Sequence, residues 1–224
     1  MDKNQVNWNE RTAQQIIQNL EKRRMEGSYA ATSAQAVEEV LAMIPHGAAV
    51  YRCGSITTTS MGLWKRIAVL PEVNIIDPFE HGLTPQESLA VRRKGLTADI
   101  MIASSNAITL DGRLVNLDGL GNRVAAMMFG PEKVILLLGM NKVAPDLDSA
   151  IARIKHYAAP VNAIRLGVDA PCTANGLCAD CRHAKLNETR RGTVYLRCTR
   201  AAWDAALPRY PRLPVTRCAG FERR

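Results

Sequence analysis

The sequence predicts an α/β fold in which helices cover a largely parallel sheet. Short apolar runs with strand composition alternate along the chain with amphipathic helical patterns, as in folds built from strand–helix–strand units. Hydrophobic residues make up 47% of the 224 residues and charged residues 22%, which is ordinary for a globular protein and argues against wholesale disorder. This length suits either one large domain or one domain with a smaller appendage.

The predicted elements follow one another over the first 157 residues. Three expected helices have both bounds, at residues 8–26, 59–64 and 145–157. Another begins at Thr32 or Ser33 and ends before Pro45. Two more are expected to begin at Pro85 and after the glycine-rich turn at 119–121. The expected strands cover residues 48–53, 73–76, 98–103 and 133–139.

Two local signatures fix the ends of elements. Thr84, Pro85 and Glu87 predict a capping box at a helix start, since the threonine and the glutamate can satisfy each other's backbone N–H groups. Asp111 and Gly112 join two short β-like runs and predict a tight hairpin.

The last part of the chain differs in composition from the rest. Residues 170–224 carry eleven Lys and Arg against four Asp and Glu, so nearly all of the net charge of +8 lies there. The sequence therefore predicts an α/β domain over residues 1–168 and a basic, cysteine-rich extension over residues 169–224. Neither a recognition helix nor an aromatic stacking platform is visible in the extension, so nucleic acid is not the expected partner.

The sequence gives no sign of membrane insertion or secretion. The first residues are polar, and apolar runs such as Val134–Leu138 are far too short to cross a bilayer. We therefore expect a cytoplasmic protein without a membrane span. In a reducing compartment, closely spaced cysteines indicate metal or redox chemistry more often than disulfides.

Several motifs resemble those of one known family. The runs DGRLVNLDGLGNR (111–123) and GMNKVAPD (139–146), the latter after a strand, are similar to the lactate utilization (LUD) domain family, which includes the C subunit of the bacterial L-lactate utilization system. Gly54-Ser55 before a threonine-rich helix start, the run TPQESLAVRRKGLTADI and the run PCTANGLCADC fit the same pattern. The resemblance covers about residues 10–181.

This resemblance implies a fold and a role. The fold would be similar to that of ribose-5-phosphate isomerase and the CoA-transferases, whose members bind anionic small molecules at the carboxyl ends of strands. The role would be that of a subunit or accessory in the oxidation of L-lactate or a related 2-hydroxy acid, alongside iron–sulfur partner proteins. Two alternatives stay open: an isomerase- or CoA-transferase-like enzyme that acts on an anionic metabolite, and a non-enzymatic assembly or regulatory module.

The cysteines of the extension are the candidate metal ligands. Cys178 and Cys181 form a C-x-x-C pair that can turn two thiolates toward one ion, with Cys198 and Cys218 to complete a four-cysteine shell and Cys172 as a fifth candidate. Such ligands suit Zn or an iron–sulfur cluster. A bound metal would also supply folding energy to a segment with little apolar periodicity. A redox dithiol and unligated thiols remain the alternatives.

Polar residues at strand ends and in a glycine-rich turn are the candidates for binding an anionic small molecule. The set comprises Gly54, Ser55, Ser104, Asn106, Gly119, Gly121, Asn122, Arg123, Asn141 and Lys142. Glycines let a ligand approach the backbone, whereas hydroxyl, guanidinium and ammonium groups donate hydrogen bonds to anions. Each has a simpler explanation too: a helix cap for Ser55, a tight turn for the glycines and a solvated loop for Lys142.

Catalytic acids and bases are harder to find. Asp111, Asp118 and Glu87 are the available carboxylates, and each has a structural explanation as a turn, loop or cap residue. The four histidines show no spacing typical of a metal site. The sequence therefore predicts a binding site more clearly than a reaction.

Overall fold

The computed structural model describes residues 2–167, 181–188, 194–209 and 218–222. The chain forms two compact units, Met1–Ile151 and Ala152–Arg224. The predicted boundary near residue 168 stays a prediction, and each unit is described by itself below. In the described parts of the chain, no helix combines the length and the apolar character that crossing a membrane requires.

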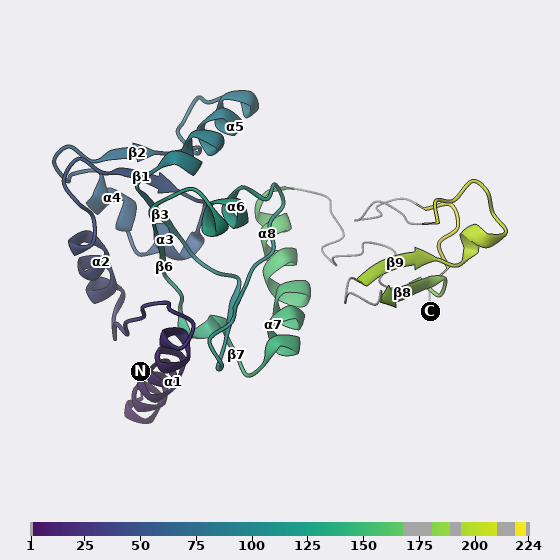
Figure 1. Ribbon diagram of the computed structural model, residues 1–224, viewed down its shortest axis with the longest axis horizontal. Coiled ribbons are helices and arrows are strands. Elements are labelled where there is room, and N and C mark those ends of the chain that lie inside the picture. The colour runs from purple at the N-terminus through teal and green to yellow at the C-terminus, as the bar shows by residue number, and fades with distance from the viewer. Residues whose placement is uncertain (1, 168–180, 189–193, 210–217, 223–224) are drawn as a thin grey trace. The chain divides into compact units, whose positions relative to one another are not determined.

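A four-stranded parallel sheet forms the centre of the first unit and confirms the predicted α/β class (Figure 1). Its strands stand in the order β2-β1-β3-β6. Their bounds are β1 (Ala49–Arg52), β2 (Asn74–Ile76), β3 (Ile100–Ala103) and β6 (Lys133–Leu136). The chain passes from β1 to β2 on one side and then crosses to β3 on the other side of β1. The carboxyl ends of β1 and β3 therefore flank the point where the strand order reverses, which is where open α/β sheets bind ligands.

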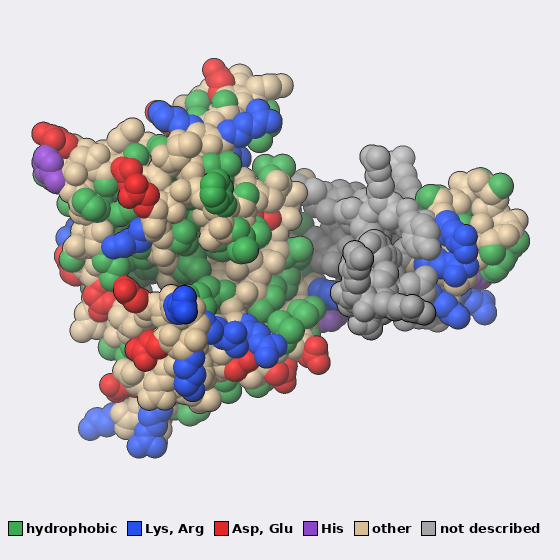
Figure 2. Space-filling view, viewed as in Figure 1, with side chains coloured by type: hydrophobic (Ala, Val, Ile, Leu, Met, Phe, Trp, Pro, Cys, Tyr) green, Lys and Arg blue, Asp and Glu red, His purple; other side chains and the backbone are tan. Residues whose placement is uncertain are grey.

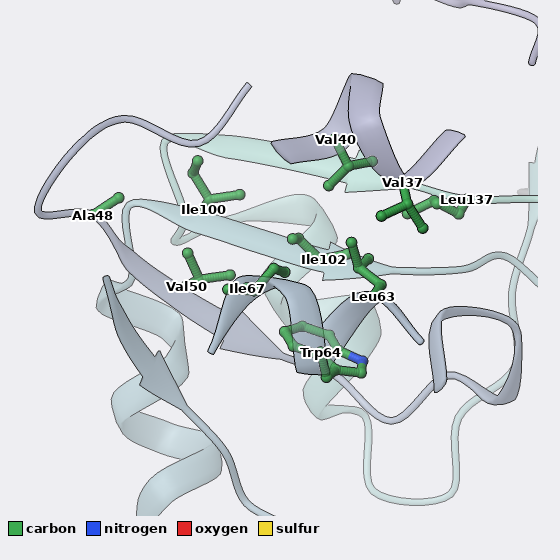
Figure 3. Close-up of a cluster of buried hydrophobic side chains, with 10 residues drawn as sticks. All are labelled: Val37, Val40, Ala48, Val50, Leu63, Trp64, Ile67, Ile100, Ile102 and Leu137. Carbon is green, nitrogen blue, oxygen red and sulfur yellow. The ribbon is translucent and has the colours of Figure 1, made fainter. Parts of the chain in front are cut away.

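Both faces of this sheet are covered because successive residues of each strand point to opposite faces. On one face, Val50, Ile100 and Ile102 pack against the helices α2 (Ser33–Ala42) and α4 (Leu63–Ile67). Figure 3 shows the side chains of these two helices pointing toward the strand residues.

The alternate side chains of each strand point to the opposite face of the sheet. Tyr51, Met101 and Ala103 are fully buried there, and Ala126 of the helix α6 (Asn122–Met128) packs with them. Burial on both faces explains why the strands read as continuous apolar runs in the sequence.

A smaller sheet in the order β5-β4-β7 lies beside the main one. Its strands are β4 (Ala107–Thr109), β5 (Leu114–Val115) and β7 (Val143–Ala144). The antiparallel pair β4–β5 confirms the predicted Asp111-Gly112 hairpin. The helix α1 (Lys3–Glu21) covers this sheet through Ile16 and Leu20, and the helix α7 (Leu147–Arg153) contributes Ala150 on the other side.

The predicted helix starts at Ser33 and at Pro85 are confirmed, whereas the helix expected over residues 8–26 begins and ends earlier, as α1. The helix α5 (Pro85–Lys94) begins with the predicted capping box, in which the Thr84 hydroxyl accepts from the Glu87 amide and the Glu87 carboxylate accepts from the Thr84 amide. A short 3₁₀ turn, η1 (Gly95–Thr97), follows it.

The prediction of one short helix over residues 59–64 is wrong. The structure has two, α3 (Ile56–Ser60) and α4, separated by Gly62. Gly62 has a φ of +71°, a left-handed conformation that ends a helix and that glycine adopts without strain.

The second unit contains the end of the long C-terminal helical segment and a hairpin. A π-helical turn, η3 (Ile154–Ala158), leads into α8 (Ala159–Arg165), so the helical segment runs past the predicted end at residue 157. Farther along the chain, β8 (Ala184–Glu188) and β9 (Val194–Cys198) pair antiparallel, and the turn η5 (Arg200–Ala202) follows them. The sequence analysis did not predict this hairpin.

Candidate anion-binding site

The predicted residues that follow β1 and β3 come together at the reversal point of the main sheet. Gly54 and Ser55 follow β1 after Cys53, and Ser104 comes directly after β3. These two strands are hydrogen-bonded neighbours, with Arg52 opposite Ile102. The edge formed by their carboxyl ends is therefore the place where the fold itself favours a ligand.

Lys142 connects the segments that follow these two strands. It lies in the 3₁₀ turn η2 (Met140–Lys142), which follows β6. Its Nζ atom donates to Thr57 Oγ1 at 3.0 Å and to Ser104 Oγ at 2.5 Å. Thr57 belongs to α3, the first helix after β1, so one ammonium group bridges the chain beyond β1 and the chain beyond β3. We call these three residues the Lys142 bridge.

Ser104 is held in place from the other side. Its side chain is almost fully buried at 4% exposure, and its hydroxyl donates to the Leu137 carbonyl oxygen at 2.5 Å, one residue beyond β6. The hydroxyl thus accepts from Lys142 and donates to the backbone at the same time. This arrangement fixes the position of the ammonium group relative to three strands.

Gly54 and Ser55 have structural roles at the start of α3. The Ser55 hydroxyl caps the helix by accepting from the Thr58 amide at 3.3 Å. Gly54 has a φ of +47°, and a Cβ atom there would stand 2.6 Å from Cζ of Phe79. Both residues lie at the predicted edge, but what they do in this structure is to shape the turn that presents Thr57.

The guanidinium of Arg123 forms hydrogen bonds within the protein. Its Nε atom donates to Asp118, its Nη1 atom to the Ser104 carbonyl and Asn116, and its Nη2 atom to Asn106 and the Leu117 carbonyl, at distances of 2.6–3.0 Å. All five N–H groups of the guanidinium therefore have acceptors. The geometry favours a role in which Arg123 and Asn106 hold the loop between β3 and α6, and a direct ligand contact by either stays a prediction.

The glycine-rich turn brings its residues to the same side of the sheet. Gly121 has a φ of +80° and precedes α6, whereas Gly119 has open space where a side chain would begin. The Asn122 amide donates to the hydroxyl of Tyr51 at 3.0 Å. Asn141 is exposed beside Lys142. Ligand binding by these four predicted residues likewise stays a prediction.

The carboxylates singled out from the sequence all have structural partners. Asp118 binds Arg123 and accepts from the Val124 amide at 2.7 Å. Asp111 accepts from the Thr109 hydroxyl, and this hydrogen bond lowers the pKa of Asp111. The capping hydrogen bonds from Thr84 likewise lower the pKa of Glu87. Their structural explanations are thus confirmed.

Tyr51 and Cys53 are buried next to this edge. Burial raises the pKa of the Tyr51 phenol and of the Cys53 thiol, because the charged form of each would lose its hydration. Both groups therefore stay protonated at neutral pH, and Cys53 has the character of a buried apolar side chain rather than that of a nucleophile.

The metal prediction concerns the second unit. Cys172 and Cys178 lie outside the described residues. Cys181 precedes β8, Cys198 ends β9 opposite Ala184, and Cys218 lies in the last described segment. Among the residues that the structure describes, no group of three or more His, Cys, Asp or Glu side chains is placed to hold an ion. The Zn or iron–sulfur site therefore stays a prediction.

An ionic cluster ties the last described segment to the hairpin. The Arg182 amide donates to the Glu222 carbonyl at 2.8 Å, and the Glu222 carboxylate lies 2.7 Å from Arg200 and 3.3 Å from His183. The interaction with His183, whose Nε2 atom lies 3.3 Å from the carboxylate, is the main cause of a lowered pKa at Glu222. This cluster brings the segment that holds Cys218 to the start of β8, where Cys181 lies.

Sequence reasoning missed two residues that complete the edge. Thr57 contacts Lys142, and Asn116 accepts hydrogen bonds from Arg123 and from the Ser105 hydroxyl. Thr57 stands in the run of threonines after Gly54-Ser55, and Asn116 stands in the motif DGRLVNLDG. Both residues therefore lie in motifs that the sequence already singles out.

Comparison with known proteins identifies the family. The family model described as the LUD domain matches residues 13–193, which is most of the chain. Neither a curated protein nor a solved structure matches it. The matched range contains the whole strand-end edge described above. The chain therefore belongs to the LUD domain family, which is associated with lactate utilization.

Proposed function

We propose that the protein binds the carboxylate of L-lactate or a related 2-hydroxy acid at the Lys142 bridge. The observation that carries this proposal is the placement of an ammonium group between the segments that follow β1 and β3, where it donates to Thr57 and Ser104. A lysine is a compact positive charge that attracts a carboxylate, and it lies at the edge where this kind of sheet binds ligands.

The hydroxyl groups beside Lys142 suit the rest of such a ligand. Thr57 is half-buried and lies 3.0 Å from the ammonium group, so a carboxylate near Lys142 would bring its neighbouring carbon substituent close to a side-chain hydroxyl. A hydroxyl group can donate to, or accept from, a 2-hydroxyl or a 2-keto oxygen. The site would thus accommodate both lactate and pyruvate.

The protein would contribute to oxidation together with iron–sulfur partner proteins. Conversion of lactate to pyruvate removes two electrons and two protons, and the partner proteins would accept the electrons. The family's association with lactate utilization supports this role. Because Asp111, Asp118 and Glu87 are engaged in structural contacts, the proposal assigns binding of the acid to this chain and leaves the removal of its electrons to the partners.

Calorimetric titration of the full chain with L-lactate and with pyruvate tests this function. Lys142→Gln should weaken binding of both at least about tenfold, since it removes a charge-assisted contact. Lys133→Gln is the matched control, because Lys133 is an exposed lysine at the opposite, amino end of β6. Equal binding by the parent and Lys142→Gln, or saturable binding by neither, would exclude the proposal.

A further inference from the structure

Phe79 lies at the same edge of the main sheet, between two guanidinium groups. It follows β2 in the chain, and its ring packs on Gly54 beyond β1. The Cζ atom of Arg92 stands 4.8 Å from the ring centroid and that of Arg52 stands 5.8 Å from it. The residue remains 47% exposed, so part of an aromatic ring with two cations beside it faces solvent.

The two guanidinium groups differ in how their charge is balanced. Arg52 forms an ion pair of 2.8 Å with Asp77 and also lies over the ring of Trp64. Arg92, on α5, is half-buried, and within the described parts of the chain no carboxylate pairs with it. Its Cζ atom lies over the ring of Phe79, and a ring face is not a conventional acceptor for the N–H groups of the guanidinium.

Arg92 also lies close to the polar groups above β1. Its charge acts on both Tyr51 and Cys53 and lowers the pKa of each, against the larger effect of burial. Asn122 donates to the Tyr51 hydroxyl at 3.0 Å and lies 3.6 Å from the Cys53 sulfur. Asn122 thus donates to Tyr51 and Cys53, and Tyr51 is fully buried, so it is the guanidinium of Arg92 that a ligand would meet at this edge.

We propose that the corner formed by Phe79 and Arg92 is a subsite for the phosphate group of a small ligand. Arg92 supplies the cation, and the exposed part of the Phe79 ring supplies an apolar wall for the group that bears the phosphate. A guanidinium presents two parallel N–H groups that match two oxygens of one phosphate.

The charge around the corner favours phosphate over a carboxylate. Arg93 and Lys94 follow Arg92 on the last turn of α5, and Figure 2 shows Lys and Arg side chains gathered over this helix. Basic residues in the last turn of a helix interact favourably with the helix dipole. This explains Arg93 and Lys94, but it does not explain why Arg92 lies over the ring of Phe79. A phosphate group carries nearly two negative charges at neutral pH, so these positive charges attract it more strongly than they attract a carboxylate.

The subsite is independent of the Lys142 bridge in its residues and in the ligand chemistry it favours. Lys142 binds through a point charge beyond β6, whereas Arg92 binds through a planar fork on α5. A phosphorylated ligand here would be a second ligand, or a second part of one ligand, beside the proposed 2-hydroxy acid. The two assignments can therefore fail separately.

Titration of the full chain with inorganic phosphate, followed by ³¹P NMR at constant ionic strength, tests the subsite. The parent should bind phosphate saturably, and Arg92→Gln should weaken binding at least about tenfold, the loss expected for one charge-assisted hydrogen-bonding partner. Arg93→Gln is the matched control, since it removes the next charge on the same helix turn, and it should change affinity less than about threefold.

Further outcomes decide against the proposal. Equal losses in Arg92→Gln and Arg93→Gln would show a diffuse electrostatic attraction, and unsaturable binding by the parent would show no site. Loss of phosphate binding in Lys142→Gln would place phosphate at the Lys142 bridge instead. Stronger binding of acetate than of phosphate would make the corner a carboxylate site. Should Arg92→Gln unfold, Arg92→Lys keeps the charge, and its loss of affinity measures the planar fork alone.

Discussion

Arg123 holds a loop together through hydrogen bonds that a lysine cannot reproduce. Its side chain is 13% exposed, and its five N–H groups reach acceptors between Ser104 and Asp118. Arg123→Lys keeps the charge but offers three donors in a different geometry, so several acceptors would lose their partner. We expect a loss of about 2–4 kcal/mol in the free energy of unfolding, measured by urea denaturation.

An exposed arginine in the same region is the matched control. Arg113 is half exposed and pairs with Asp111 at the surface, so Arg113→Lys should cost less than about 0.5 kcal/mol. Similar losses in the two variants would contradict the role assigned to Arg123.

At the scale of single residues, the sequence predicts where a side chain lies better than it predicts what that side chain binds. Strand ends place Ser104 and Lys142 at one edge, and the structure joins them by a hydrogen bond. The sequence makes the guanidinium of Arg123 a candidate ligand donor because its acceptors, among them Asn106 and the Ser104 carbonyl, lie up to 19 positions earlier in the chain. Only tertiary structure shows that such a group is already satisfied.

The helix α5 depends on the ionised form of a carboxylate at its first turn. The amide and hydroxyl of Thr84 donate to Glu87, and these hydrogen bonds lower its pKa below the ordinary value of 4.5. A carboxylate with a lowered folded-state pKa stabilises the fold fully above the unfolded-state pKa, and this contribution is lost as the pH falls through the folded-state pKa. Acid should therefore weaken this helix start.

Glu87→Gln isolates this effect, because glutamine keeps the capping hydrogen bonds but carries no charge. The parent should be the more stable protein at pH 7, and its advantage over Glu87→Gln should shrink as the pH is lowered below about 4.5, as followed by urea denaturation at several pH values. Glu80→Gln, at an exposed position outside any helix, should show no comparable pH-dependent difference. An advantage that stays constant down to pH 3 would refute the assignment.

At the scale of elements, the sequence predicts correctly those features that residues close together in the chain determine. The capping box of α5 and the hairpin at Asp111-Gly112 each depend on residues a few positions apart, and both are confirmed. The break at Gly62 depends on how α3 and α4 pack, because only α4 contributes side chains to the core beside Val50. The hairpin of β8 and β9 lacks strong apolar alternation, so composition alone did not indicate it.

At the scale of the whole molecule, the cysteines of the second unit predict a bound metal. Protein purified without oxygen should contain Zn or iron by elemental analysis, and Cys181→Ser and Cys198→Ser should each lower the metal content and the thermal stability, because structural metal binding contributes folding free energy. Iron with a visible absorption band would indicate a cluster, whereas Zn has none.

Cys53→Ser provides the control for this prediction. Cys53 is a buried free thiol of the first unit, packed among apolar side chains on the face of the sheet that α6 covers. Its substitution should lower stability while it leaves the metal content unchanged. Unchanged metal content in Cys181→Ser and Cys198→Ser would leave these cysteines as unligated thiols or a redox pair.

The Lys142 bridge also determines when a folding chain completes this strand-end edge. Lys142 meets Thr57 across 85 positions of sequence and Ser104 across 38. Contacts this distant form late, because the intervening chain must be ordered before they stabilise anything. A chain still emerging from the ribosome without β6 and Lys142 has its first strands but no cation between their ends. The proposed anion binding would therefore require a chain that is synthesised and folded through Lys142, and shorter chains would not sequester ligand.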